Sequence, residues 1–121
     1  MINCTCFSLP DVFYLDEGPK GFEESLHQED MQDWMRLYSC PKCGTLWAID
    51  EWDKYQYQIV GRVKDRSTWS SDQRIEERKQ LLLRSRGGTT DETCIWSGCV
   101  QKRVKGVVYC LEHLWNTGAR R

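Results

Sequence analysis

The 121-residue sequence has no continuous apolar segment of the roughly 18 to 20 residues that a membrane-spanning helix requires. Its first residues, MINCTCFSLPDVFYLDEGPKGFEE, also lack the basic start and apolar stretch of a secretory signal peptide. It contains no internal repeat and no low-complexity tract. We therefore expect a cytoplasmic protein without a membrane span, in a compartment where cysteine thiols stay reduced.

Histidine and proline are scarce, with two and three residues, whereas cysteine is abundant, with seven. An odd number of cysteines in a reducing compartment fits a disulfide framework poorly and is better explained by metal binding or reactivity. The hydrophobic fraction of 40 % and the charged fraction of 29 % favour a folded chain over a disordered one. Because 121 residues provide only one modest core, a bound metal ion would add much to stability.

The pattern of apolar residues predicts an α+β fold, a small single domain with zinc-knuckle hairpins, a short antiparallel sheet and two or three helices. Within it we expect a ribbon-like part over about 1–66 and a helix plus treble-clef-like part over about 67–121. Ser70 and Gln73 have the spacing of a capping box, and Gly87 and Gly88 can end the helix that follows. The expected helices are 22–33, 71–85 and 111–116, and the expected strands are 34–38, 45–50, 55–63 and two short ones in 103–110.

Eight residues able to bind a metal fall into four local pairs, which together use every cysteine in the sequence. Two such pairs make one tetrahedral site, so the sequence predicts two structural Zn²⁺ ions with four protein ligands each. Crossed combinations of the pairs stay open at this point. The predicted ligands are Cys4, Cys6, Cys40, Cys43, Cys94, Cys99, Cys110 and His113.

The clearest pair lies in CPKCG at residues 40–44. Two cysteines separated by two residues turn both sulfurs toward one point, proline preforms the turn, and glycine lets the chain leave with a positive φ. The motif resembles the zinc knuckle of zinc-ribbon and rubredoxin-like modules, in which a second cysteine pair completes the site. Cys4 and Cys6 are the expected second pair, although only one residue separates them. The alternative is that they are two small residues near the N-terminus.

The second set lies in CIWSGCVQKRVKGVVYCLEH at residues 94–113. Cys110 and His113 are three residues apart at the start of an expected helix, which places both side chains on one face. The order of knuckle, hairpin and helix with ligands in its first turn resembles a treble-clef zinc finger, although four residues separate Cys94 from Cys99. Buried thiols without a metal are the alternative.

Closed sites with four protein ligands leave no place for water or substrate, so we expect structural zinc and no enzymatic activity. The competing hypothesis is a catalytic cysteine activated by His27 or His113, which requires a cysteine outside the metal sites. Glu112 beside His113 lacks the second histidine of a zinc hydrolase motif. RSRGGTTDE lacks the preceding strand and the lysine of a phosphate-binding loop.

The net charge of −1 conceals an asymmetry, because residues 1–60 hold eleven acidic and four basic residues whereas residues 61–121 hold seven and thirteen. The two halves could therefore attract each other or serve different partners. Most of the six tryptophans are expected in the core. Trp52 is the exception, because it is set among Asp50, Glu51 and Asp53 and so is a candidate anchor for a basic protein partner.

The acidic, tryptophan-bearing stretch RLYSCPKCGTLWAIDEWDKYQYQ and the ending KGVVYCLEHLWNTGARR together resemble small bacterial immunity proteins, including those that accompany contact-dependent growth-inhibition toxins. This resemblance implies a protein that binds and neutralises one cognate toxin domain. A carboxylate-rich surface can occupy the positive cleft of a nucleic-acid-cutting toxin as a phosphate backbone would. The expected contact residues are Trp52 and the acids Glu23, Glu24, Glu29, Asp30, Asp33, Asp50, Glu51 and Asp53.

The alternative function is that of a nucleic-acid-binding zinc-finger protein, transcriptional or RNA-related. Arg84, Arg86, Lys102 and Arg103 would then contact the phosphate backbone. The acids interleaved in RIEERKQ are also typical of an ordinary exposed helix, which makes nucleic acid the second choice as partner.

Overall fold

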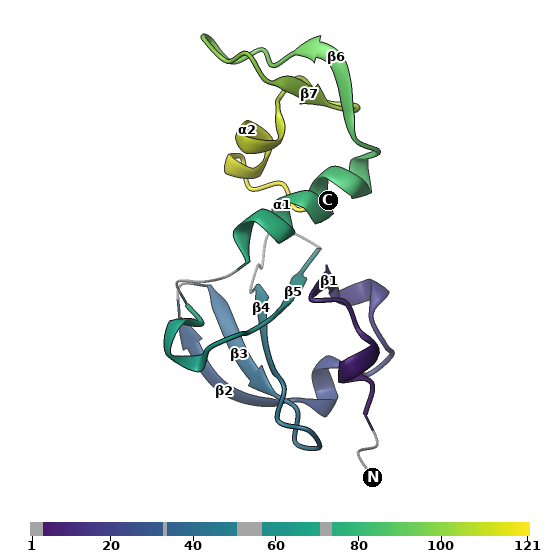
Figure 1. Cartoon of the computed structure of the whole chain (residues 1–121), viewed down its shortest axis with the longest axis vertical. Helices are drawn as coiled ribbons and strands as arrows, with labels where there is room; N and C mark the ends of the chain where they lie inside the picture. Colours follow the sequence, from purple (N-terminus) through teal and green to yellow (C-terminus); the bar gives the residue numbers. More distant parts are fainter. Residues whose placement is uncertain (1–3, 33, 51–56, 71–73) are drawn as a thin grey trace. The chain divides into compact units, whose positions relative to one another are not determined.

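The computed structural model describes residues 4–32, 34–50, 57–70 and 74–121. The chain forms two compact units, Met1–Ile75 and Glu76–Arg121, called unit 1 and unit 2 below. Unit 1 holds a five-stranded antiparallel sheet, and unit 2 holds a two-stranded sheet with α-helices (Figure 1). The predicted α+β class is confirmed. Over the described residues, neither α-helix has the length and apolar character that crossing a membrane requires.

The sheet of unit 1 has the order β1-β5-β4-β3-β2, with every neighbouring pair antiparallel. The expected hairpin around CPKCG is confirmed as β3 and β4, and the expected strand that follows is confirmed as the shorter β5. The strands are β1 (Val12–Tyr14), β2 (His27–Gln32), β3 (Met35–Ser39), β4 (Leu46–Asp50) and β5 (Ile59–Arg62).

Side chains alternate between the two faces of the sheet along each strand, and buried residues pack on both faces. Trp47 on β4 packs edge to face against Phe13 and Phe22, with ring centroids 5.6 and 5.5 Å away. The neighbouring residue Ala48 faces the opposite way and packs with Trp69. The central strand β4 therefore has a continuous apolar run over residues 46–49, as strands buried on both faces do.

The predicted helix over 22–33 is wrong. Residues Glu23–Ser25 form one 3-10 turn, and His27–Gln32 form the edge strand β2, which pairs with β3. The segment has neither the apolar period of a helix nor that of a strand, so hydrogen bonding to β3 decides its structure. β1 was also missed, since three residues are too few to show a period.

Unit 2 is built from most of α1 (Ile75–Arg86), β6 (Thr89–Thr93), β7 (Lys102–Val104) and α2 (Leu111–Asn116). Its small core consists of Leu82, Val104 and Leu114, around which half-buried side chains pack. The predicted helix over 111–116 is confirmed, and so is a helix ending at Gly87 and Gly88, both with positive φ. The proposed cap residue Gln73 lies outside the described residues, and Ile75 at the start of α1 is exposed.

The predicted pair of strands over 103–110 is wrong in its partner. β7 pairs with β6, and the chain after the turn at Gly106 forms no strand. The Val104 amide nevertheless donates to the Tyr109 carbonyl at 2.8 Å, so the segment folds back beside β7. Val107 and Tyr109 pack on the core of unit 2. The apolar residues that suggested a second strand therefore belong to a turn and contribute to this core.

The expectation that most tryptophans are buried holds for Trp47 and Trp69 only, among the five that the structure describes. Trp34 is 61 % exposed and Trp96 56 % exposed, whereas Trp115 is half-buried. Trp34 occupies the turn between β2 and β3 with a φ of 64°, so the turn itself holds its side chain away from the sheet. Trp52 lies outside the described residues.

Candidate metal centres

The first cysteine group begins with the tight turn that joins β3 to β4. The Cys40 amide donates to the Thr45 carbonyl at 2.9 Å, and the Gly44 amide donates to the Cys40 carbonyl at 2.8 Å. Gly44 has a φ of 80°, the left-handed conformation that favours glycine. These constraints aim the sulfurs of Cys40 and Cys43 at the same space, as the CPKCG motif predicts.

Cys4 and Cys6 approach this turn from a separate segment, in which Cys6–Ser8 form a 3-10 turn. The Arg62 guanidinium on β5 anchors this segment by donating to the Cys6 and Leu9 carbonyls at 2.8 and 2.9 Å. It also lies 4.4 Å from the ring centroid of Trp47. A long-range contact that the cysteine spacing does not reveal therefore brings the two pairs together.

The four sulfurs of the first group, from Cys4, Cys6, Cys40 and Cys43, all lie within 4.8 Å of one another. Burial, reinforced by the neighbouring thiols, raises the pKa of Cys6 to about 12. Burial also opposes ionisation of Cys43, but hydrogen bonds from Thr45 and from neighbouring thiols outweigh it and lower its pKa to about 6. Four thiols this close cannot all ionise without a compensating positive charge, which a divalent cation supplies.

A buried donor also faces this group. The Trp47 indole N–H is buried without a hydrogen-bond partner among the described residues, and Trp47 acts on Cys6 to lower the pKa of that thiol. Ionisation of Cys6, which metal binding requires, would give this N–H an acceptor. An open hollow of about 240 Å³, bordered by Cys4, Cys6 and Cys40, connects the group with solvent.

The second cysteine group is assembled within unit 2 from the β6–β7 hairpin and the start of α2. The Cys94 amide donates to the Gln101 carbonyl at 2.8 Å, which closes the loop that carries Cys94 and Cys99. Cys110 is the N-cap residue of α2, and His113 follows in the first turn. The predicted placement of these two ligands at a helix start is therefore correct.

The distances within the second group match a tetrahedral site. His113 Nδ1 lies 3.3 Å from the Cys94 sulfur and 3.2 Å from the Cys110 sulfur, and the Cys99 and Cys110 sulfurs are 3.8 Å apart. With zinc–sulfur bonds of about 2.3 Å, the edge of a tetrahedron joining two sulfurs is about 3.8 Å. All seven cysteines are free thiols.

Burial raises the pKa of Cys110, with the Cys94 and Cys99 thiols adding to the increase. Burial acts in the same direction on Cys94, but hydrogen bonds from the backbone amides of Cys110 and Trp96 and from His113 lower the pKa of that thiol to about 6. As in the first group, neighbouring thiols hinder one another from ionising together. The donor set thus suits a cation and disfavours an empty cluster of thiolates.

The structure brings together all eight predicted ligands, four by four, and each group could hold a metal ion. The pairing is Cys4 and Cys6 with Cys40 and Cys43, and Cys94 and Cys99 with Cys110 and His113. Each group lies within one unit. His27, the remaining histidine, is on β2 with Nε2 3.6 Å from a Glu29 oxygen and belongs to neither group.

The expected partner-binding acids have different surroundings. Asp50 is only 5 % exposed and therefore offers little to a partner. Glu29 is half-buried, and hydrogen bonds from Ser39 and Arg66 lower the pKa of its carboxyl. Glu24 and Asp30 are exposed and Glu23 is half-buried, whereas Asp33, Glu51, Trp52 and Asp53 lie outside the described residues.

Two exposed tryptophans were missed as candidate functional residues. Trp34 follows β2, a strand in which Met31 is also exposed. Trp96 stacks on the His113 imidazole, with centroids 4.7 Å apart and planes 15° from parallel. The exposure of Trp96 could have been predicted from its position between Cys94 and Cys99. When both sulfurs of such a short loop point to one site, the side chains between them have little room to be buried.

Comparison of the chain with protein-family models, with curated proteins and with solved structures gives no significant match.

Proposed function

We propose that the chain is a non-catalytic binding protein in which one structural zinc ion stabilises each unit and an acidic surface of unit 1 binds a basic protein domain. The observation that carries the zinc assignment is the pair of four-ligand groups, Cys₄ and Cys₃His. Thiolate and imidazole ligands in tetrahedral arrangement favour zinc over magnesium or calcium, which prefer oxygen. Four protein ligands leave no position for water, which supports a structural role.

Elemental analysis of protein purified without chelator tests the zinc assignment. We expect two zinc ions per chain, and loss of near-ultraviolet circular dichroism when a strong chelator removes them, because such ions supply on the order of 10 kcal/mol of folding free energy. Protein that contains no zinc, or that keeps its circular dichroism spectrum after complete removal, would refute the assignment.

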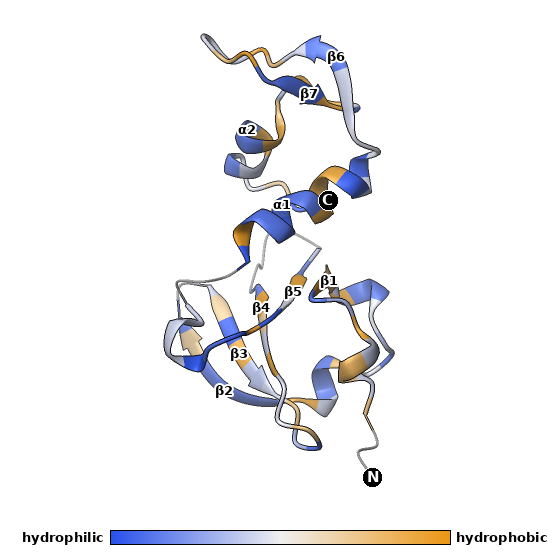
Figure 2. Ribbon diagram, viewed as in Figure 1, coloured by the Kyte–Doolittle hydropathy of each residue, from blue (hydrophilic) through white to orange (hydrophobic). Residues whose placement is uncertain are grey.

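The β2–β3 turn supports a protein-binding surface on unit 1. Trp34 and Met31 are 61 and 50 % exposed, and the exposed Asp30 is adjacent to Met31. A surface with exposed tryptophan, methionine and aspartate side chains combines apolar anchors with charge that attracts a basic partner. Figure 2 shows β2 as one of the most hydrophilic strands, and Met31, near its end, is an exposed apolar residue in this polar segment.

The overall charge of unit 1 favours the same class of partner. Unit 1 contains thirteen acidic and eight basic residues, a net charge of −5. Four thiolates and one Zn²⁺ would lower it by a further two charges, to −7. We propose a cognate bacterial toxin domain with a positive nucleic-acid-binding cleft as the partner, so that the chain acts as its immunity protein. The attraction would be fast and sensitive to salt.

Binding to the toxin domain encoded beside this chain tests that proposal. We expect Trp34→Ala to weaken binding about 30-fold or more, as loss of a hot-spot residue does. Asp30→Lys should mainly slow association and reduce its salt dependence. Phe7→Ala is the matched control, since Phe7 is an exposed aromatic residue of the same unit, on a different segment. Equal affinity of all four proteins would rule out this surface.

A further inference from the structure

Exposed apolar side chains are concentrated around the second cysteine group. Trp96 and Val100 are 56 and 80 % exposed, although each is within three residues of a ligand cysteine. Ile95 and Val108 are also exposed, and the Ile95 amide donates to the Val108 carbonyl at 2.9 Å, which places the two residues together. These four residues, Ile95, Trp96, Val100 and Val108, are called the knuckle patch.

The fold around the ligands keeps the knuckle patch at the surface. The Cys99 amide donates to the Trp96 carbonyl at 3.0 Å, which forms a turn between the two ligand cysteines. Because the ligand sulfurs converge on one point, the side chains between them have no core to enter. Apolar side chains held out in this way indicate a binding surface.

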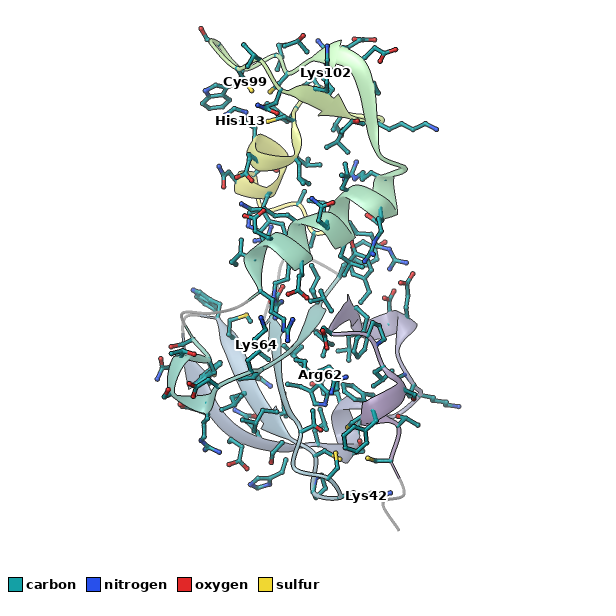
Figure 3. The ribbon with its side chains drawn as sticks, viewed as in Figure 1. Lys42, Arg62, Lys64, Cys99, Lys102 and His113 are labelled. Carbon is teal, nitrogen blue, oxygen red and sulfur yellow. The ribbon has the colours of Figure 1, made fainter. Side chains whose placement is uncertain are left out.

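The unit that carries the knuckle patch is positively charged. Lys102 and Lys105 are exposed, whereas Arg103 is paired with Glu92 at 2.7 Å. Unit 2 as a whole contains five acidic and nine basic residues, a net charge of +4, which three thiolates and one Zn²⁺ would reduce only to +3. Lys102 is the first residue of β7 and comes three residues after Cys99. Figure 3 labels Lys102, Cys99 and His113, which all belong to unit 2. A negatively charged partner fits the net charge of this unit.

The Trp96 ring is a platform suited to a flat partner. His113 covers one face of the indole, with ring centroids 4.7 Å apart, and the residue is nevertheless 56 % exposed, so its exposed area belongs to the other face and the ring edge. The loop hydrogen bonds and the contact with a ligand histidine fix the orientation of the ring. Binding would therefore cost little side-chain entropy.

We propose that the knuckle patch binds single-stranded nucleic acid, with one base stacked on Trp96 and phosphates near Lys102 and Lys105. Stacking on an aromatic ring next to basic side chains is the general means by which proteins hold single strands. A base inside a duplex cannot reach the indole face, which favours single strands. The inference rests on the proposed structural zinc only in that the metal holds the loop and His113 in place.

Titration of a fluorescently labelled 12-nucleotide single-stranded RNA or DNA of mixed sequence with the full zinc-loaded chain tests this proposal. We expect saturable binding at low salt, and a loss of about 5-fold to 100-fold with Trp96→Ala, the range for one stacked base. Trp96→Phe should recover most of the affinity. Phe7→Ala is the matched control, because Phe7 is also an exposed aromatic residue but lies on unit 1.

The salt dependence tests the phosphate contacts. Replacing Lys102 and Lys105 by alanine should reduce the slope of log affinity against log salt by about 1.4, since each contact with a single strand contributes about 0.7. Lys64→Ala, which changes an exposed lysine of unit 1, should leave the slope unchanged.

Zinc content measured in every variant separates the two proposals. A wild-type chain that lacks zinc contradicts the proposed function, and nucleic-acid binding by that chain would still support the present inference. A chain with two zinc ions that binds neither oligonucleotide, binds only duplex DNA, or loses binding with Phe7→Ala but not with Trp96→Ala would overturn the inference. The same holds if an acidic peptide binds the knuckle patch and the oligonucleotides do not.

Discussion

Lys79 on α1 donates hydrogen bonds to both carboxylate oxygens of Glu112 on α2, at 2.9 and 2.8 Å. The Lys79 side chain is 11 % exposed and that of Glu112 57 %. Glu112 precedes the ligand His113, so the pair connects α1 to the turn of α2 that carries the second cysteine group. The sequence analysis compared Glu112 with a hydrolase motif, whereas its observed contact is this ion pair.

Replacing Lys79 by methionine should lower the free energy of unfolding of unit 2 by about 1 kcal/mol, a modest value because Glu112 is well exposed to solvent. The hydrogen bonds from Lys79 to Glu112 raise the pKa of Lys79 above its ordinary value, and burial opposes this only in part. A raised lysine pKa gives stability that is complete below about pH 10 and is lost as pH rises through the folded value. Chemical denaturation at pH 7, 9 and 11 measures it. Lys105→Met, at an exposed lysine of the same unit, is the control and should change stability little at any of these values.

Replacing His113 by cysteine should preserve the second metal ion, because Nδ1 lies within 3.3 Å of two sulfurs and a thiolate is an equally suitable ligand. His113→Ala should remove it and leave one zinc ion per chain. Inductively coupled plasma mass spectrometry on the purified variants counts the ions. Full zinc content in His113→Ala would show that His113 is not a ligand.

Replacing Arg62 by lysine should weaken the first metal centre, because lysine cannot reproduce the contacts that tie the segment of Cys6 to β5. Arg62 also bonds Asp11 at 2.9 Å. We expect a loss of about 2 kcal/mol in stability, since several partially buried hydrogen bonds are broken. A chelator competition assay should show faster zinc release from one of two sites.

The matched control is Arg66→Lys, which changes an exposed arginine paired with Glu29 at 3.1 Å. It should leave both release rates unchanged, because Arg66 contacts neither metal group. If Arg62→Lys and Arg66→Lys behave alike, the anchoring role of Arg62 is wrong.

Replacing Gly44 or Gly98 by alanine should cost about 1 kcal/mol each, because both have a φ of 80° and left-handed backbone is unfavourable for alanine. An added Cβ would meet no atom within 4 Å at either position, so the cost comes from the backbone alone. Each substitution should reduce zinc affinity at its own centre only, measured by competition with a chromogenic chelator. A loss larger than about 3 kcal/mol would instead indicate steric conflict.

The residues that could hold a metal were predictable from the sequence because the constraint on them is local. Cys40 and Cys43 in CPKCG, and Cys110 and His113, each have two residues between them, a spacing that brings the donor atoms together in a tight turn or a helix start. The central strand β4 was predictable for a similar reason, since its apolar residues are consecutive and follow the turn at Gly44.

Other features depend on partners distant in the sequence. The edge strand β2 forms because its backbone hydrogen-bonds to β3. Its own sequence is polar and has no strand periodicity, so this pairing with β3 decides its structure. Cys4 and Cys6 join Cys40 and Cys43 only because Arg62, on a strand more than 50 residues later, anchors their segment. The exposure of Trp34 and Trp96 likewise follows from the turns that carry them, because burial of a tryptophan is decided by the space around it and not by its hydrophobicity.

The spacing of neighbouring cysteine and histidine residues was enough to predict local pairs that could hold a metal, since it constrains where their donor atoms can lie. Which pairs share a centre, and which aromatic rings face solvent, became clear only from the folded chain. Both depend on long-range packing and hydrogen bonding, whose free energies are set by segments that the local sequence does not specify.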